Sequence, residues 1–257
     1  RGAPEVLAPP TVVATRYVAP LREGGSNPAL MEADDDGLYV VKFRGAGQGP
    51  KALIAELVAG ELGRLLGLPV PEIAFVELDP ALARAEPDPE IQDLLNASPG
   101  LNLGLDFLPG ALAFDAAAAS GLAEELAADV VWFDALVTNL DRTPRNPNLL
   151  LWHERLWLID HGAALYRQHG STDLAAEAKQ AFPAIREHVL LPYAGSILEA
   201  DSRLAPRLDS ASLHQLVELV PDSWLEHPRA AYASYLEGRL NEPRGFAQEA
   251  EDARRAS

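Results

Sequence analysis

The sequence predicts an α+β fold, in which several strands and one helix come first and a mainly helical part follows. Residues 11–43 hold three short strand-like runs, of which the first and the third are rich in β-branched and aromatic residues, and turn-forming residues such as glycine, aspartate and asparagine separate them. From residue 122 onward, apolar residues recur at helical spacing in several segments. A β-hairpin is expected over residues 149–159, so the helical part carries a small piece of sheet.

The composition of the 257-residue chain excludes several classes of function. Apolar residues make up 48% and charged residues 23%, which is ordinary for a soluble globular protein. The net charge of −17 argues against binding to nucleic acid or to an anionic membrane surface. Cysteine is absent, so disulfides and thiolate chemistry are excluded. No apolar stretch reaches the roughly 18 residues that span a bilayer and no signal peptide is recognisable, so we expect a cytoplasmic protein.

The N-terminal elements can be assigned in order. The expected elements are strands at residues 11–21, 29–33 and 38–43, a helix at residues 50–66, and further strands that begin near residues 68 and 101. Pro50 suits the first turn of the helix, and Gly67 suits its C-terminal cap. Residues 45–49, GAGQG, could hold phosphate through backbone N–H groups or act as a flexible link, and the sequence leaves both readings open.

Lys42 is the first candidate for chemistry. It lies within the apolar third strand, where a lysine is costly unless its ammonium group meets an anion. It could be an edge-strand lysine that points to water, or a lysine that binds ATP phosphates and pairs with a helix glutamate. Glu56 lies near the apolar face of the following helix and is the better partner, whereas Glu61 fits a solvated face.

Residues 122–162 contain the strongest functional pattern. A helix is expected over residues 122–137, and Asp141 and Asn146 lie five residues apart in the polar loop after it. Asp160 comes directly after the hairpin. Phosphoryl transfer from ATP needs a carboxylate that orients the attacking hydroxyl, and it needs carboxylate and amide oxygens that hold magnesium on the phosphates. Alternatively, these residues are ordinary turn formers of a surface loop.

The sequence around these acids resembles known kinases. DRTPRN at 141–146 resembles the Asp-Arg-x-x-x-Asn loop of phosphatidylinositol kinases, and IDHG at 159–162 resembles their Asp-Phe-Gly element. DGLYVVKFRGAGQGP, GLPVPE and NPNLLLW extend the likeness, so that roughly residues 10–240 resemble HipA-like kinase domains of the actinobacterial type. Two positions depart from the pattern. His161 stands in place of the phenylalanine, and Asn139-Leu140 stand before Asp141 where a histidine is expected.

The resemblance implies a two-lobe protein-kinase-like fold. The N-lobe, residues 1–108, would be an antiparallel sheet with one helix, and the C-lobe, residues 109–257, would be mainly helical with the β-hairpin at the active site. The implied reaction is transfer of the γ-phosphoryl group of ATP, with Mg²⁺, to a hydroxyl, with Ser or Thr of a protein as the favoured acceptor. A nucleotide-binding pseudokinase or regulatory module and an AMP-transferring enzyme are the alternatives.

The resemblance also assigns roles to single residues. The implied assignments are Asp141 as the catalytic acid, Lys42 as the phosphate-binding lysine with Glu56 as its partner, Asn146 and Asp160 as magnesium ligands, Gly24, Gly25 and Ser26 as the loop over the phosphates, and Phe107 and Leu108 as the hinge beside adenine.

Overall fold

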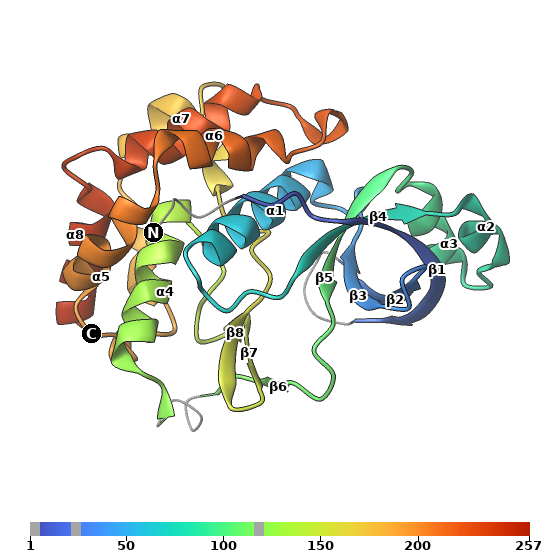
Figure 1. The fold of residues 1–257 in the computed structure, drawn as a ribbon, viewed down its shortest axis with the longest axis horizontal. Helices are drawn as coiled ribbons and strands as arrows, with labels where there is room; N and C mark the ends of the chain where they lie inside the picture. The colour runs from blue at the N-terminus through green and yellow to red at the C-terminus, as the bar shows by residue number, and fades with distance from the viewer. Residues whose placement is uncertain (1–5, 22–26, 116–120) are drawn as a thin grey trace.

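The computed structural model describes residues 6–21, 27–115 and 121–257 (Figure 1). The first part of the chain holds β1 (Thr11–Pro20), β2 (Ala29–Ala33), β3 (Leu38–Lys42), α1 (Gly49–Leu65), β4 (Ile73–Leu78), α2 (Pro80–Ala85), α3 (Pro89–Asn96) and β5 (Leu101–Asp106). The second part holds β6 (Leu112–Ala113), α4 (Glu124–Val137), β7 (Leu149–Trp152), β8 (Arg155–Leu158), α5 (Ile197–Leu204), α6 (Ser210–Glu218), α7 (Arg229–Leu240) and α8 (Gly245–Arg255). Short 3-10 helices lie at η2 (Tyr166–His169), η3 (Ala175–Lys179), η4 (Pro183–Glu187), η5 (Leu191–Tyr193), η6 (Ala205–Arg207) and η7 (Asp222–Trp224).

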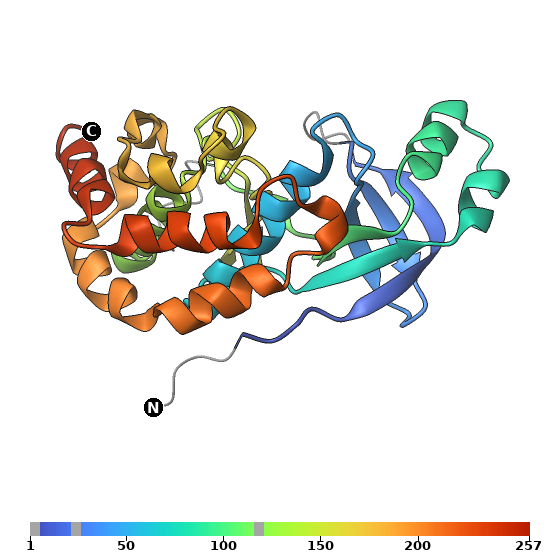
Figure 2. The ribbon, with the colours of Figure 1, turned by 90° about the horizontal axis from the view of Figure 1, so that it is seen from above.

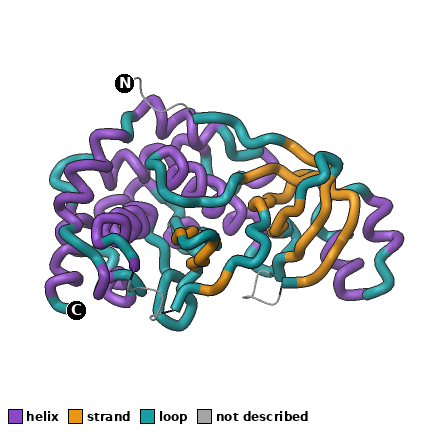
Figure 3. The backbone as a smooth tube through the Cα atoms, turned by 60° about the horizontal axis from the view of Figure 1, so that its bottom comes forward, coloured by secondary structure: helices purple, strands orange, loops and turns teal. Residues whose placement is uncertain are grey.

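The first five strands close into a barrel in the order β1-β2-β3-β5-β4 (Figures 1 and 3). Neighbouring strands run antiparallel except β1 and β4, which pair in parallel. Closure depends on β1, because its first residues pair with β4 and its later residues pair with β2 across two register shifts. Such irregularities bend and twist a strand. The expected antiparallel sheet is therefore corrected to a closed barrel, and the shorter helices α2 and α3 accompany the expected helix α1.

Helix α1 lies between the barrel and the C-terminal helices (Figure 2). Its side chains are buried on nearly all sides. It ends as the sequence predicts, because Gly67 adopts a φ of +80° and its N–H donates to the carbonyl of Arg64 at 2.9 Å. One hydrophobic cluster fills the barrel below α2 and α3, and a larger one joins α1 to α4 and the C-terminal helices. The core thus continues past residue 108, and the division into lobes at 1–108 and 109–257 stays a prediction.

Helix α4 is the centre of the C-terminal half, where α5, α7 and α8 pack against it. Its residues 130–137 are all buried, and Thr138 ends it with a left-handed φ of 51°. The expected hairpin is confirmed as β7–β8, which turns at His153 and Glu154 with φ values of 48° and 61°, as a two-residue turn requires. None of the helices in the described ranges combines the length and apolar character that crossing a membrane requires.

A segment at residues 222–226, which we call the clasp, reaches from the C-terminal half to the barrel. The indole of Trp224 packs edge-on against Phe75 of β4, with ring centroids 5.8 Å apart, and its Nε1 donates to the carbonyl of Leu101 at 3.1 Å. Lys51 of α1 pairs with Glu226 at 2.8 Å. The clasp therefore fastens the barrel to the helical half at a point distant in sequence from the β5–β6 connection.

Candidate active site

A cavity of about 280 Å³ lies where the barrel meets the β7–β8 hairpin. Its polar end holds Lys42 of β3, Asn148 and Asp160. Phe107 and Leu108, the expected hinge residues, also line it. The remaining lining residues are Leu21, Pro28, Val40, Pro71, Leu105, Asp106, Gly110, Ala111, Leu150 and Ile159. A pocket with one mainly apolar region and a few converging polar groups is typical of a small-molecule site.

Lys42 binds two carboxylates at the polar end of the cavity. Its Nζ lies 2.5 Å from Oε2 of Glu56 and also contacts Oδ1 of Asp160. Burial alone would lower the pKa of Lys42, but the charges of Glu56 and Asp160 outweigh it and raise the pKa. Burial would likewise raise the pKa of Glu56, but Lys42 lowers it. Glu61 instead lies 3.6 Å from Arg64, so the structure brings Lys42 to Glu56 and not to Glu61.

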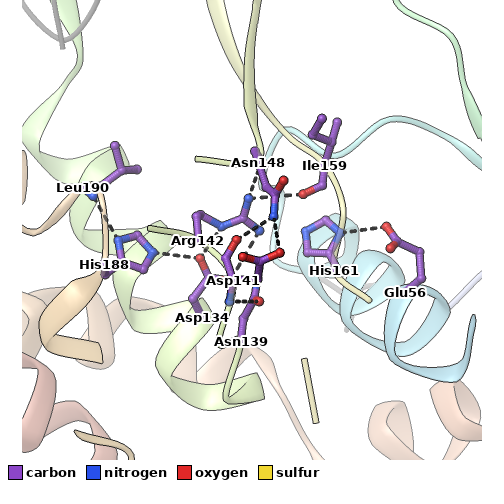
Figure 4. A network of polar contacts seen from close by, with 10 residues as sticks. All are labelled: Glu56, Asp134, Asn139, Asp141, Arg142, Asn148, Ile159, His161, His188 and Leu190. Carbon is purple, nitrogen blue, oxygen red and sulfur yellow. Dashed lines mark hydrogen bonds and ion pairs between the residues drawn. The ribbon is translucent and has the colours of Figure 1, made fainter. Parts of the chain in front are cut away.

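His161, which departs from the kinase pattern, lies directly behind this pair. It is fully buried, and its Nδ1 is 3.3 Å from Oε1 of Glu56 (Figure 4). Its ring meets that of Phe133 edge-on, with centroids 5.9 Å apart. His161 therefore keeps an aromatic ring against α4 and adds a polar contact that holds Glu56, which a phenylalanine could not do.

Asp141 is held by three asparagines. Its carboxylate Oδ2 accepts from Nδ2 of Asn146 at 2.8 Å, and Nδ2 of Asn148 lies 3.4 Å from the same oxygen. Its main-chain N–H donates to Oδ1 of Asn139 at 3.1 Å. Burial and the nearby charge of Asp160 raise the pKa of Asp141, while the asparagine hydrogen bonds oppose the rise. Its other carboxylate oxygen, Oδ1, accepts no hydrogen bond from the described residues.

Arg142 joins the loop to the end of the hairpin (Figure 4). Its Nε donates to Oδ2 of Asp134 at 2.5 Å, and its Nη1 donates to the carbonyls of Asn148 at 2.5 Å and Ile159 at 3.3 Å. Asn139 also donates to Asp134, at 3.0 Å. Burial alone would raise the pKa of Asp134, but Arg142 and the His188 hydrogen bond outweigh it and lower the pKa. This buried ion pair fixes the Asp141 loop relative to Asp160.

Sequence reasoning missed this supporting layer. Asp134 carried a usable signal, because it is the only charged residue in the apolar run VVWFDALV and a buried acid needs a partner. Arg142 belongs to the DRTPRN motif, but the motif gives no indication that its partner is the buried Asp134. Asn148 and His188 carried no signal in spacing, because only the folded chain brings them to Asp141 and Asp134.

The tautomer of His188 follows from its two hydrogen bonds. The main-chain N–H of Leu190 donates to Nδ1 at 3.1 Å, so Nδ1 carries no proton. The proton is therefore on Nε2, which donates to Oδ2 of Asp134 at 2.8 Å. Burial lowers the pKa of His188. His188 is a neutral donor that supports the Asp134–Arg142 pair.

We expect His188→Gln to reduce the loss of stability at mildly acidic pH. Because the native pKa is lowered, the unfolded chain binds a proton first as the pH falls below about 6.5, which removes up to about 1.4 kcal/mol of unfolding free energy per pH unit. Glutamine does not titrate, yet it can donate to Asp134 and accept from Leu190. Urea unfolding at pH 7 and pH 5.5 measures how steeply the unfolding free energy falls with pH. The exposed His214→Gln serves as control, and equal slopes in His188→Gln and the parent would contradict this account.

The structure describes only one of the two glycine-containing loops for which the sequence suggests phosphate binding. Gly24, Gly25 and Ser26, the expected phosphate-covering loop, lie outside the described residues. In the GAGQG loop, a side chain on Gly45 would place its Cβ 2.5 Å from the carbonyl oxygen of Ala97. Gly45 is therefore required by a close backbone approach, which favours a structural part for that end of the loop.

The oxygen atoms of Asp160 and of the asparagines after Asp141 are of the kind that binds magnesium. Mg²⁺ is usually held by one or two carboxylates together with substrate phosphates. The Asp160 carboxylate is at the cavity, and the amide oxygens of Asn146 and Asn148 accept no hydrogen bond from the described residues. The donor set therefore fits a hard cation bound through oxygen.

Comparisons with known proteins agree with this arrangement. A search of curated proteins finds no match. Among solved structures, the chain is similar to the proinflammatory kinase CtkA of Helicobacter pylori, with a TM-score of 0.58 and 15% identity over 96% of this chain and 99% of that one. That likeness shows a shared fold. The family model for HipA-like kinases matches residues 15–241. This chain therefore belongs to the HipA-like kinase family.

Proposed function

We propose that this chain transfers the γ-phosphoryl group of ATP, with Mg²⁺, to the hydroxyl of a serine or threonine in a protein. The observation that carries the proposal is the contact of buried Lys42 with both Glu56 and Asp160 at the polar end of the cavity. Glu56 compensates the charge of Lys42 and leaves the Asp160 carboxylate for a metal cation, so the cluster suits a triphosphate that binds as its magnesium complex. Family membership supports phosphoryl transfer in general. The protein acceptor is the part of the proposal that the resemblance to HipA-like kinases implies.

The apolar part of the cavity suits an adenine ring. Val40 and Leu105 come from the barrel, and Leu150 and Ile159 come from the hairpin, so a flat ring could lie between two apolar walls. At the hinge, the carbonyl of Leu108 accepts from Ala111 in a turn, whereas its N–H has no partner among the described residues. We assign this N–H of Leu108 as the hydrogen-bond donor to the adenine ring.

The polar residues of the site would bind the phosphates, hold the metal and orient the acceptor hydroxyl. Lys42, kept in place by Glu56, would bind the α- and β-phosphates. Asp160 would hold the metal, together with an amide oxygen from the Asp141 loop. When bound, Mg²⁺ would neutralise charge on the phosphates. Asp141 would orient the acceptor hydroxyl and take its proton on Oδ1, because its other oxygen is engaged by Asn146.

Nucleotide binding tests the proposal through thermal stability. A ligand at a hundredfold excess over Kd stabilises the native state by about 2.7 kcal/mol, and each kcal/mol shifts Tm by roughly 2–4 °C at this size. Saturating ATP analogue with Mg²⁺ should therefore raise Tm on the order of 5–10 °C. Asp160→Ala or omission of Mg²⁺ should remove most of the shift. No shift with any nucleotide would contradict the proposal.

Mass analysis after incubation with ATP identifies the transferred group. Phosphoryl transfer adds about 80 Da to the acceptor and AMP transfer adds about 329 Da, because different bonds of ATP break. A pseudokinase leaves no adduct. The proposal expects the smaller addition on serine or threonine.

A further inference from the structure

Two asparagines near Asp141, Asn146 and Asn148, are candidates for the amide ligand of the metal in the proposed function. Motif spacing points to Asn146 as the amide ligand of the metal. In the structure, however, Asn146 belongs to a tight turn with Pro144 and Arg145 at its tip. The main-chain N–H of Thr143 donates to the carbonyl of Asn146 and the N–H of Asn146 donates to the carbonyl of Thr143, both at 3.1 Å. Two residues of the loop, Pro144 and Arg145, form the tip of this turn, so the chain reaches the hairpin two residues later than it would without the turn.

Asn148 stands where the hairpin ladder continues toward Asp160. Leu149 pairs with Leu158 in the hairpin, and the carbonyl of Asn148 accepts from the N–H of Ile159 at 3.1 Å. Asn148 is thus opposite the residue that immediately precedes Asp160. Asn148 and Asp160 both line the cavity, whereas Asn146 is absent from its lining among the described residues.

The hydrogen bonds fix the orientation of the Asn148 amide (Figure 4). Its Nδ2 donates to the main-chain carbonyl of Asp141 at 2.5 Å. Because the amino group is used on Asp141, the amide oxygen is directed elsewhere, and it accepts no hydrogen bond from the described residues. The backbone is also held, because Arg142 donates to the carbonyl of Asn148 at 2.5 Å. The φ of 49° at this position suits asparagine better than most residues.

We infer that Asn148, and not Asn146, supplies the amide oxygen that binds the metal beside Asp160. Asn146 is a positioning residue that holds the Asp141 carboxylate through Nδ2 at 2.8 Å. The inference rests on the proposed function, because it assigns a ligand for the metal that the kinase reaction uses. It concerns the binding of metal, so it can be tested without turnover.

The test compares Asn148→Gly with the matched variant Asn146→Gly. Glycine removes the amide from each position and tolerates the left-handed backbone of residue 148. Free Mn²⁺ is followed by electron paramagnetic resonance with a non-hydrolysable ATP analogue present. Asn148→Gly should weaken Mn²⁺ binding roughly tenfold or more. Asn146→Gly should leave Mn²⁺ affinity close to that of the parent, because the Asn146 side chain contacts Asp141 and neither proposed ligand. Nucleotide affinity without metal should stay the same in both variants.

Asn146 has its own readout. Loss of its hydrogen bond should leave the Asp141 carboxylate less well oriented, so Asn146→Gly should lower kcat while the KM for nucleotide stays near that of the parent. If Asn148→Gly does not fold, the pair Asn148→Asp and Asn146→Asp decides, because an added carboxylate should tighten Mn²⁺ binding only at the ligand position.

The outcomes separate the inference from the proposed function. Weaker Mn²⁺ binding in Asn146→Gly alone, or equal weakening in both glycine variants, would overturn the assignment while the kinase proposal stands. A parent protein that fails to bind Mn²⁺ with the analogue would overturn both.

Discussion

Replacement of Asp141 by asparagine should lower phosphoryl transfer by about 10²–10⁴-fold, the usual contribution of a positioned general base. Asparagine keeps the size of the side chain and can still accept from Asn146, so the loop should keep its conformation. The loss should therefore appear in kcat, whereas the nucleotide-induced shift in Tm should persist. A rate assay with a phosphorylated protein product, combined with the thermal shift, measures both.

Asp36→Asn is the control for the change in charge, because Asp36 lies in the exposed β2–β3 turn and its φ of 63° suits asparagine. It should behave as the parent. Full activity in Asp141→Asn would remove Asp141 from the mechanism and leave the DRTPRN loop as a structural turn.

The largest loss of stability is expected from Asp134→Asn. Arg142 is 1% exposed, and Asp134 is the carboxylate that pairs with it. Removal of one partner of a buried ion pair leaves an uncompensated charge, which lowers the unfolding free energy by about 3–5 kcal/mol. At this size that corresponds to a decrease in Tm of roughly 6–20 °C. Denaturant and thermal unfolding of the apo protein measure the effect.

The matched control is Asp222→Asn, which removes an ion pair of similar geometry with Arg229 at the surface, where the Asp222 side chain is 89% exposed. Exposed pairs contribute about 0–1 kcal/mol, so its Tm should barely change. The double variant Asp134→Asn with Arg142→Met should lose less than the two single changes together, because contacting residues couple. A small loss in Asp134→Asn, equal to that of the control, would show that Arg142 is solvated or otherwise compensated.

Many helices and strands could be predicted from local sequence patterns, because residue spacing and turn-forming residues determine where such elements begin and end. The strand with Lys42, the helix with Glu56 and the hairpin before Asp160 all follow from residue spacing and turn chemistry. Barrel closure could not be predicted in this way, because the parallel pairing of β1 with β4 joins distant segments and leaves no periodic signal.

The site shows the same division between local and distant information. Asp141 and Asp160 are recognisable because each stands next to a predictable element. The choice between Asn146 and Asn148 depends on a tight turn of the loop, which shifts the register by two residues without altering the composition. Asp134 could have been recognised as a buried acid, but its partner is decided by the path of the chain after α4.

The clasp becomes available to the barrel only late in the synthesis of the chain. Trp224 donates to Leu101, which precedes it by 123 residues. At synthesis rates of roughly 5–20 residues per second, Trp224 leaves the ribosome roughly 6–25 s after Leu101. During that interval the barrel is present without the indole that covers Phe75. The final seating of the barrel on the helical half therefore waits until the clasp has emerged.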